Sequence, residues 1–530
     1  MFDLYSYLFS YKNLVERSNL GISVYQNKDL IGYILPCRNV DEIISVKVKN
    51  EVMKFFKDSG LESNILVLTN NLGLEIGYFL LEFNTEINCV NFKKMNISEL
   101  DNIELLRLYL EAFELFAEID LLAKEILIEV LPGEEYQRNF LNNENYFQID
   151  KTDIFSKNLV AMRKKADKIL TAGPSISQVE TMLVNDAVRN GWNNNHSDYI
   201  NKFESEFANF VGSKFAMATS SCTGALHLSL LALGIKEGDE VIVPEVTWVA
   251  TASAVRYVGA TPVFADIDPL TWTISLQSIK DLVTEKTKVI IPVHLYGYAA
   301  NLIEISNFAK SKGIFVVEDA APAIGTKIGH KFAGAIGDIG CYSFQGAKML
   351  VTGEGGMLVT NDEALYKKVK KIQDHGRKPG TFWIEELGFK YKMSNIQAAL
   401  GLAQLYRADN QIFRKRRINS WYKDGLKGIK GISFQQELVG TESICWMTSI
   451  KIGNSISVSR DEVISKLMDK GIDSRPVFPA ISQYPFWNVK YSPKTTAKEV
   501  GDSGINLPSG VNLSKNSIDY VISSLHEILA

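Results

Sequence analysis

The feature that most constrains the fold is an alternation of short apolar runs and amphipathic segments between residues 172 and 410. Seven runs have the length and composition of buried strands: Phe215–Ala218, Glu240–Val243, Thr261–Ala265, Lys288–Pro292, Gly313–Val317, Gly340–Phe344 and Gly356–Thr360. Four segments between them have helical periodicity: Gly224–Leu233, Ala250–Val258, Leu276–Leu282 and Leu302–Lys312. Short strands that are apolar on both faces need helices above and below them. The pattern therefore predicts an α/β domain with a mainly parallel sheet.

Two changes of pattern divide the chain into three predicted domains. A breaker, Thr171–Pro174, precedes the alternating region. Beyond it, two long helices, Gln411–Leu426 and Ser459–Lys470, flank short strands near Trp446–Ile452 and indicate a small α+β domain. We therefore expect an N-terminal accessory domain over residues 1–165, a large domain over 166–410 and a small domain over 411–530.

A lysine and an acid in the large domain have the arrangement that pyridoxal phosphate (PLP) chemistry requires. Asp319 ends an apolar strand, and Lys348 follows 29 residues later on a loop, just before the glycine turn 353–356. In such sites the lysine forms a Schiff base, and the acid keeps the pyridine nitrogen protonated so that the ring accepts electrons. Either residue alone would more often be a strand end or a surface lysine. Together they predict a PLP site in which Lys348 and Asp319 are catalytic.

The motifs around this pair resemble those of the DegT/StrS-type sugar aminotransferases. The resemblance extends from about Ala172 to the C-terminus. It implies the aspartate-aminotransferase fold (PLP fold type I), PLP as cofactor, glutamate as amino donor and a nucleotide-linked keto sugar as acceptor, for the synthesis of surface polysaccharides or glycoconjugates. It also implies a homodimer or a higher homo-oligomer, with each site formed between two subunits. The stretches 472–479 and 445–450 look most like perosamine-synthase-type members, which aminate C4 of a GDP-linked 4-keto-6-deoxy sugar.

The resemblance assigns cofactor contacts to residues at strand ends and at one helix start. The segment Ser220–Leu226 places small hydroxyl residues and a glycine before an apolar helix, where free N–H groups can hold a phosphate. Simple N-capping would explain the same residues. In the family, the positions of Thr223 and Gly224 hold the PLP phosphate, and Ser343 is expected to help. An aromatic residue at the position of Trp248 stacks on the pyridine ring.

Two positions depart from the family pattern. The family often has Gln, Glu or His three residues after the aspartate, whereas this chain has Pro322, which cannot form a side-chain hydrogen bond. The segment 387–393 matches one that usually reads N-Y-R, whose asparagine reaches the cofactor phosphate of the neighbouring subunit. Lys390 occupies that position. We expect its ammonium group to take over the phosphate contact, and a solvated surface charge is the alternative.

Four further residues are candidate substrate contacts. His294 lies at a strand end near the expected site, although a structural histidine would occupy the same place. Arg475 matches a family segment that approaches from the small domain, and could pair with a carboxylate of the donor or with a diphosphate. Asn194 and His196 lie where the family has a loop near the sugar.

The first 165 residues alternate as well and predict an α/β accessory domain. Expected strands are Gly21–Tyr25, Leu30–Leu35, Ile65–Leu68, Gly77–Phe83 and Glu125–Val130, and expected helices are Asp41–Asp58 and Ile97–Glu118. The stretch Val130–Tyr146 faintly resembles the end of an acyl-CoA N-acetyltransferase, but the chain lacks an R/Q-x-x-G-x-G/A loop to hold the cofactor phosphates. A domain for oligomerisation or partner binding is therefore favoured over a bifunctional aminotransferase/acetyltransferase.

Composition argues against several other classes of protein. The net charge is −4, from 57 basic and 61 acidic residues, which argues against a general nucleic-acid binder. Five scattered cysteines without a C-x-x-C pair or a Cys/His cluster predict no metal site and fit a reducing cytosol. The chain has no signal-peptide pattern and no run of 18 apolar residues. We therefore expect a cytoplasmic protein without a membrane span.

Three other activities compete with sugar amination. Relatives that dehydrate sugars have histidine in place of the lysine, so Lys348 argues against that reaction. The intact Asp319/Lys348 pair also argues against a non-catalytic sensor or assembly protein. A PLP enzyme for a non-nucleotide ketone, such as an aminocyclitol precursor, stays open, because function depends on the site rather than on the fold.

Overall fold

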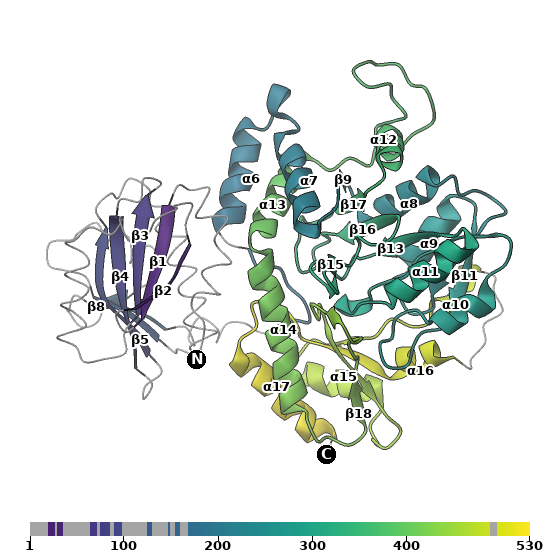
Figure 1. Ribbon diagram of the computed structural model, residues 1–530. Helices are drawn as coiled ribbons and strands as arrows, with labels where there is room; N and C mark the ends of the chain where they lie inside the picture. Colours follow the sequence, from purple (N-terminus) through teal and green to yellow (C-terminus); the bar gives the residue numbers. More distant parts are fainter. Residues whose placement is uncertain are drawn as a thin grey trace. The chain divides into compact units, whose positions relative to one another are not determined.

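The computed structural model describes residues 168–176, 178–487 and 495–529, together with eight strands in the first 167 residues. The chain forms two compact units, Met1–Asp167 and Lys168–Ala530, which we call the N-terminal unit and the C-terminal unit (Figure 1). The sequence predicts this division at residue 165, two residues before the end of the N-terminal unit.

The described strands of the N-terminal unit form one sheet in the order β2-β1-β3-β4-β5-β6-β8-β7. Their bounds are β1 (Leu20–Gln26), β2 (Asp29–Ile34), β3 (Asn64–Asn70), β4 (Glu75–Asn84), β5 (Cys89–Ile97), β6 (Glu125–Glu129), β7 (Phe147–Gln148) and β8 (Ile154–Asn158). Neighbours are antiparallel except β5 and β6, which are parallel. The five expected strands coincide with β1–β4 and β6, whereas the sequence predicts no strand at β5, β7 or β8. The helices expected about Asp41–Asp58 and Ile97–Glu118, and the stretch Val130–Tyr146, lie outside the described residues, apart from Ile97, which ends β5.

A seven-stranded sheet forms the centre of the C-terminal unit, in the order β11-β10-β12-β13-β16-β17-β9. Its strands are β9 (Phe215–Thr219), β10 (Glu240–Pro244), β11 (Thr261–Ala265), β12 (Thr287–Ile290), β13 (Phe315–Asp319), β16 (Ile339–Ser343) and β17 (Gly356–Thr360). The five strands from β11 to β16 are parallel, and β17 is antiparallel to both of its neighbours. All seven coincide with predicted apolar runs, so the prediction of a mainly parallel sheet is confirmed.

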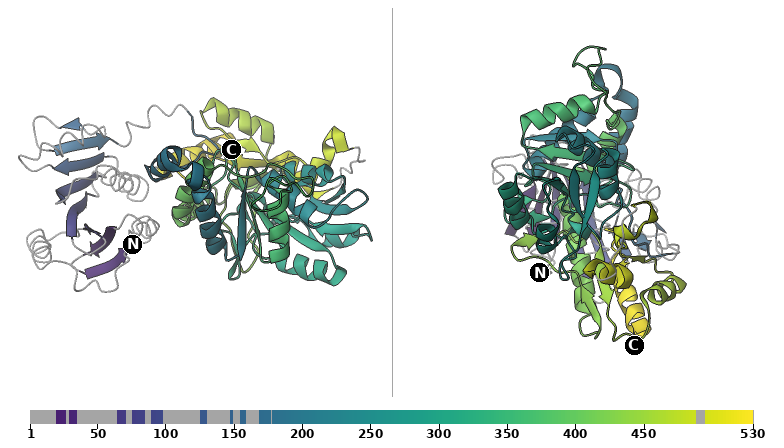
Figure 2. Two further views of the ribbon diagram at one scale, coloured as in Figure 1. Left: turned by 90° about the horizontal axis from the view of Figure 1, so that it is seen from above. Right: turned by 90° about the vertical axis from the view of Figure 1, so that its right-hand side faces the viewer.

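Helices cover both faces of this sheet (Figures 1 and 2). In β17, Leu358 packs into the core that also holds residues of α8 (Cys222–Ala232), α9 (Ala250–Tyr257) and α12 (Glu363–Ile372). Its neighbours Met357 and Val359 pack into the opposite core, with α7 (Asp198–Val211) and α13 (Asn395–Tyr406). The helices α10 (Leu276–Leu282) and α11 (Leu302–Lys312) pack against β10, β11, β12 and β13 in a third core. Because successive strand residues face opposite sides, a sheet covered in this way needs apolar residues throughout.

The small C-terminal region packs three helices against a four-stranded antiparallel sheet. The helices are α14 (Ala408–Gly425), α15 (Arg460–Asp469) and α17 (Lys515–Leu529), and the sheet has the order β18 (Ile432–Phe434), β20 (Thr448–Ile452), β22 (Gly504–Leu507), β21 (Arg475–Pro476). Their buried side chains form a separate hydrophobic core. This region agrees with the α+β arrangement expected from the sequence.

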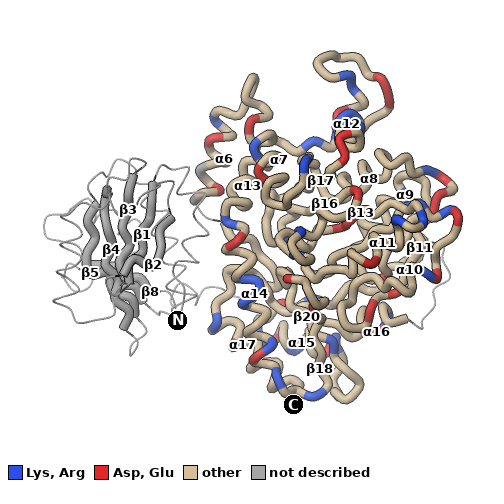
Figure 3. Tube along the Cα trace, in the orientation of Figure 1, with Lys and Arg blue, Asp and Glu red and all other residues tan. Residues whose placement is uncertain are grey.

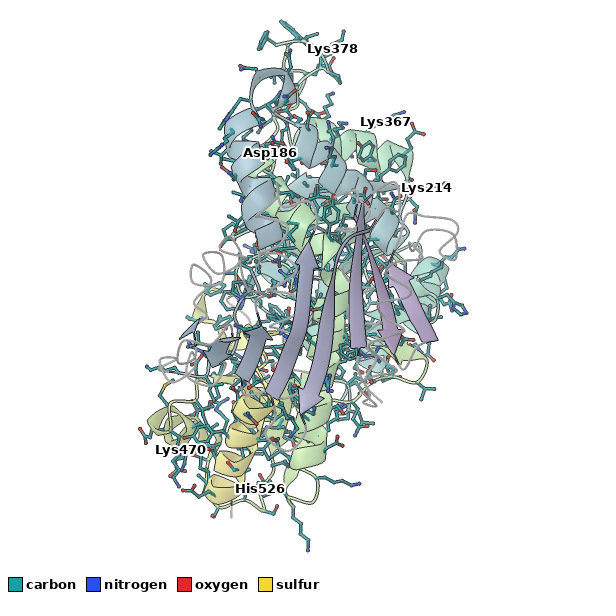
Figure 4. All side chains as sticks on the ribbon, turned by 90° about the vertical axis from the view of Figure 1, so that its left-hand side faces the viewer. Asp186, Lys214, Lys367, Lys378, Lys470 and His526 are labelled. Atoms are coloured by element: carbon teal, nitrogen blue, oxygen red, sulfur yellow. The ribbon has the colours of Figure 1, made fainter. Side chains whose placement is uncertain are left out.

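The middle of the segment between α12 and α13, residues 373–394, extends away from the body of the C-terminal unit (Figure 1), and we call the whole segment the projecting loop. Lys378 lies in this loop, at the end of the unit remote from Lys470 and His526 (Figure 4). The side chains of Phe382 and Leu387 are 95% and 90% exposed. Exposed apolar side chains gathered on one loop are typical of an interaction surface.

Charged residues of both signs are interspersed along the chain of the C-terminal unit (Figure 3). Among the helices that the structure describes, none is both long enough and apolar enough to cross a membrane.

Candidate active site

A cavity of about 590 Å³ lies at the carboxyl ends of the parallel strands. One wall comes from the sheet, with residues that follow β10 and those that end β13 and β16. The facing wall comes from the small region and includes Trp446, Arg475, Phe478 and Asn506. Open α/β sheets bind ligands at this edge, because the loops that follow the strands diverge there.

Lys348 lies in the wall of this cavity. Its Nζ is 4.0 Å from the centre of the Trp446 ring, and the indole Nε1 of Trp446 donates a hydrogen bond to the carbonyl oxygen of Ala347 at 3.0 Å. Burial lowers the pKa of Lys348 below its usual range, although the negative charge of Asp319 acts in the opposite direction. A lowered pKa favours the neutral amine, which is the form that acts as a nucleophile and a proton acceptor.

Asp319 ends β13, lines the same cavity and is 5% exposed. Its Oδ2 accepts a hydrogen bond from Thr251 Oγ1 at 2.7 Å, and its Oδ1 accepts one from the backbone N–H of Ala321 at 3.2 Å. Burial raises the pKa of Asp319, and the bonds from Thr251 and Ala321 partly offset that effect. A cation placed against this carboxylate would favour its charged form, and a protonated pyridine nitrogen is such a cation.

The N-terminus of α8 forms a second polar corner of the cavity. Ser221 caps the helix by accepting a hydrogen bond from the N–H of Gly224 at 3.0 Å, and Ser221 and Thr223 line the cavity together with Ser343. Gly356 pairs with Ser343 across β16 and β17, and an added Cβ on Gly356 would lie 2.5 Å from the backbone of Ser221. A glycine at this position therefore lets the hydroxyl of Ser343 and the helix N-terminus face one corner, as a phosphate requires.

Trp248 and Phe478 are two neighbouring aromatic residues in the wall of the cavity. The Trp248 side chain is 60% exposed, and its ring centre lies 5.7 Å from that of Phe478. Trp248 follows β10, and its carbonyl oxygen lies 3.3 Å from the hydroxyl of Thr251. A tryptophan with a large exposed ring area at a cavity wall can cover a flat ligand ring.

The structure brings six of the predicted cofactor residues to this cavity or to its edge: Lys348, Asp319, Thr223, Gly224, Trp248 and Ser343. The N–H of Gly224 is engaged by the Ser221 cap, so Gly224 contributes to the shape of the helix start. Ala321, rather than Pro322, lines the cavity beyond Asp319.

Lys390 lies in the projecting loop, outside the residues that line the cavity. Its Nζ is 3.4 Å from Asp374 Oδ1, and its side chain is 59% exposed. The adjacent Tyr391 accepts a hydrogen bond from the backbone N–H of Ser220 at 2.7 Å, next to the start of α8. The contact of Lys390 with a neighbouring subunit's cofactor therefore stays a prediction.

Three of the predicted substrate residues do not line the cavity of this subunit. His294 is fully buried behind Asp319, where its Nε2 lies 3.0 Å from Glu318 Oε2 and its Nδ1 accepts a hydrogen bond from the N–H of Ala300. Asn194 and His196 are exposed at the short 3₁₀ helix 193–195. Arg475 is the predicted substrate residue that lines the cavity.

These features fit PLP. The cavity offers a lysine with a lowered pKa, a buried carboxylate for a ring cation, a polar corner for a phosphate and an indole for the ring face. A model of the DegT/DnrJ/EryC1/StrS aminotransferase family matches residues 174–526. The chain belongs to the DegT/DnrJ/EryC1/StrS aminotransferase family. It is therefore a PLP-dependent sugar aminotransferase.

Curated relatives and solved structures agree with this assignment. The GDP-perosamine synthase of Escherichia coli O157:H7 is 41% identical over 355 residues, which are 67% of this chain and 96% of the relative. The GDP-perosamine synthase of Caulobacter vibrioides is 38% identical over 68% of this chain and 98% of its own length. The aminotransferase of Psychrobacter cryohalolentis has a TM-score of 0.63 at 30% identity, covering 67% of this chain and 98% of the other. Spr1654 of Streptococcus pneumoniae, solved in its PLP form, has a TM-score of 0.64 at 27% identity, covering 68% and 100%.

Several residues of the aminotransferase site were not predicted from the sequence. Thr251 donates a hydrogen bond to Asp319, and the Trp446 ring lies against the Lys348 ammonium group. Tyr296 and Asn506 also line the cavity. Thr251 carried a usable signal, because it follows Thr247 by four residues in a segment that begins directly after a strand. Trp446 lies in the stretch 445–450, whose resemblance to the family assigns it no role of its own, and Tyr296 and Asn506 lie outside the motifs that assigned cofactor contacts.

Proposed function

We propose that this aminotransferase transfers the amino group of glutamate to a nucleotide-linked 4-keto-6-deoxy sugar, with GDP as the nucleotide. The observation that carries the proposal is the cavity between the large sheet and the small region. Lys348 and Asp319 line it together with the aromatic side chain of Trp446 and the cationic side chain of Arg475. The similarity to two GDP-perosamine synthases supports GDP and amination at C4. The product would serve the synthesis of a surface polysaccharide or glycoconjugate.

Lys348 and Asp319 would divide the chemistry between them. Bound PLP supplies an electron sink that stabilises negative charge at the carbon next to the amino nitrogen. Lys348 would bind the cofactor covalently and, once released, move a proton to and from the reacting carbon, for which its lowered pKa prepares it. Asp319 would hold the ring nitrogen in its protonated form, and Thr251 keeps the Asp319 carboxylate turned toward the cavity.

Arg475 would bind an anionic group of the substrate. It lines the cavity from the small region, and its side chain is 68% exposed. A guanidinium can donate two parallel hydrogen bonds to a phosphate or to a carboxylate. Asn194 and His196 stay candidate contacts to the sugar, whereas the buried pair with Glu318 favours a structural role for His294.

The competent form would be a homodimer. The projecting loop exposes Phe382 and Leu387 and carries Lys390 beside Asp374. A second copy of the chain would bury these apolar side chains, and it would give Lys390 access to a neighbouring phosphate. We also propose a cytoplasmic location, which is supported by the free thiols of Cys222, Cys341 and Cys445.

The half-reactions can be followed separately by absorbance. Wild-type protein saturated with PLP should show a visible band that converts to a near-ultraviolet band when glutamate is added. Addition of the GDP-linked 4-keto-6-deoxy sugar should then restore the visible band. A spectrum that glutamate leaves unchanged would exclude glutamate as the donor. A spectrum that responds to glutamate, but not to the sugar, would exclude this acceptor.

A further inference from the structure

The segment 169–171 lies at the start of the C-terminal unit, before the part of the chain that the family model matches, and its last residue lines the cavity. Ile169 donates a backbone hydrogen bond to Gly471 and accepts one from Asp473, each at 2.8 Å. Two residues later, the carbonyl oxygen of Thr171 accepts a hydrogen bond from the N–H of Ser509 at 2.9 Å. Thr171 is 4% exposed and lines the cavity. The backbone of this segment is therefore held on both sides by the small region.

The side chain of Thr171 is directed at Asp473. Its Oγ1 lies 2.7 Å from Asp473 Oδ2 and 2.9 Å from the carbonyl oxygen of Asp473, and its backbone N–H donates to the same Oδ2 at 3.3 Å. Asp473 is 6% exposed. A buried carboxylate needs donors for its oxygens, and Thr171 supplies two of them for Oδ2.

The other oxygen of Asp473 faces Arg475. Oδ1 lies 3.2 Å from Arg475 Nε, and the backbone of Arg475 is paired with Asn506 across β21 and β22. Because this ion pair uses Nε, the terminal N–H groups of the guanidinium can still be directed at a ligand in the cavity. An exposed arginine otherwise samples many rotamers, and fixing one of them in advance lowers the entropy lost when a ligand binds.

We propose that Thr171 and Asp473 are positioning residues that hold Arg475 toward an anionic group of the substrate. This inference rests on the proposed function of the cavity. The group recognised is a phosphate of the nucleotide sugar or a carboxylate of the amino donor, which share the same bidentate chemistry. The assignment makes the segment before the aminotransferase fold a determinant of substrate affinity.

A double-mutant cycle tests this inference by binding, without relying on turnover. Calorimetry on the full chain gives the Kd of GDP and of glutarate, a dicarboxylate that cannot donate an amino group. Thr171→Val and Arg475→Gln should each raise the Kd of the same one of these two ligands by about tenfold. Thr171→Ser keeps the hydroxyl and should bind both ligands like the wild type. The ligand that responds identifies the source of the anionic group.

The double variant Thr171→Val/Arg475→Gln should bind no more weakly than Arg475→Gln, because Thr171 acts through Arg475. An additive loss would overturn the inference and give Thr171 a structural role. Unchanged Kd values in Thr171→Val would overturn it as well. If Thr171→Val does not fold, Asp473→Asn replaces it in the same cycle.

Steady-state kinetics give a second readout. KM for the responding substrate should rise in Thr171→Val while kcat stays within about twofold, since the change affects ligand binding alone. Wild-type protein that binds both ligands but turns over neither substrate would refute the proposed function. The binding cycle would still decide the role of Thr171.

Discussion

A lysine buried behind the cavity provides a quantitative test of the structure. Lys415 lies in α14, and its side chain is buried. Its Nζ donates a hydrogen bond to the carbonyl oxygen of Trp446 at 2.8 Å and another to that of Ser509. Burial lowers the pKa of Lys415 from 10.5 to about 7. A neutral amine has two N–H groups, which match these two carbonyl oxygens.

The lowered pKa makes stability depend on pH in a defined direction. Between the folded pKa and the unfolded pKa, the unfolded chain binds a proton on Lys415 that the folded chain does not. The free energy of unfolding therefore rises with pH in this window. With pKa values of about 7 and 10.5, the rise between pH 7 and pH 9 is about 2 kcal/mol. Lys415→Met has no proton to bind and should lose this contribution.

Urea unfolding at pH 7, 8 and 9 measures the effect, with PLP saturating throughout. All seven tryptophans lie in the C-terminal unit, so tryptophan fluorescence reports its unfolding. Relative to Lys415→Met, the wild type should gain about 2 kcal/mol of unfolding free energy from pH 7 to pH 9. Lys367→Met, which removes an exposed lysine of α12, is the control and should follow the wild type. If the free energy of unfolding changes with pH in the same way for wild type and Lys415→Met, the reasoning is refuted.

Three further predictions concern the cofactor, the assembly and the N-terminal unit. Thr251→Val removes the donor at 2.7 Å from Asp319 and should raise the Kd of PLP about tenfold in a fluorescence titration; an unchanged Kd would argue against this support. Phe382→Asp should shift the protein toward monomer in light scattering, whereas Val439→Asp, at an equally exposed apolar residue outside the projecting loop, should not; equal behaviour of the two variants would exclude the loop as the interface. A chain that begins at Ala166 should keep the glutamate-dependent change in absorbance, and its loss would assign the N-terminal unit a role in amination.

The sheet could be predicted because burial on both faces leaves a clear pattern. A strand covered by helices on both sides, such as β10 with Val241, Ile242 and Val243 divided between two cores, must be apolar throughout. Such runs stand out against the amphipathic helices between them. Asp319 and Lys348 could be predicted for a related reason, since Asp319 ends a parallel strand and Lys348 lies on the loop that follows β16, and both places meet at the carboxyl edge of the sheet.

Contacts between residues far apart in the chain could not be predicted. Thr171 meets Asp473 across 302 residues, and Trp446 meets Ala347 across 99. These pairs depend on how the small region packs against the sheet, which no local spacing encodes. His294 illustrates the converse case. Its position at a strand end fits a substrate contact and a structural histidine equally well, and the contact with Glu318 in the interior favours the structural role.

The most direct test of the central claim is to locate the covalent attachment of the cofactor. Wild-type protein is saturated with PLP, reduced with borohydride, digested and analysed by mass spectrometry. The reduced cofactor should be attached to the peptide that contains Lys348, and Lys348→Ala should carry none. Modification of another lysine, or the same visible band in Lys348→Ala, would contradict the assignment of this cavity as the active site.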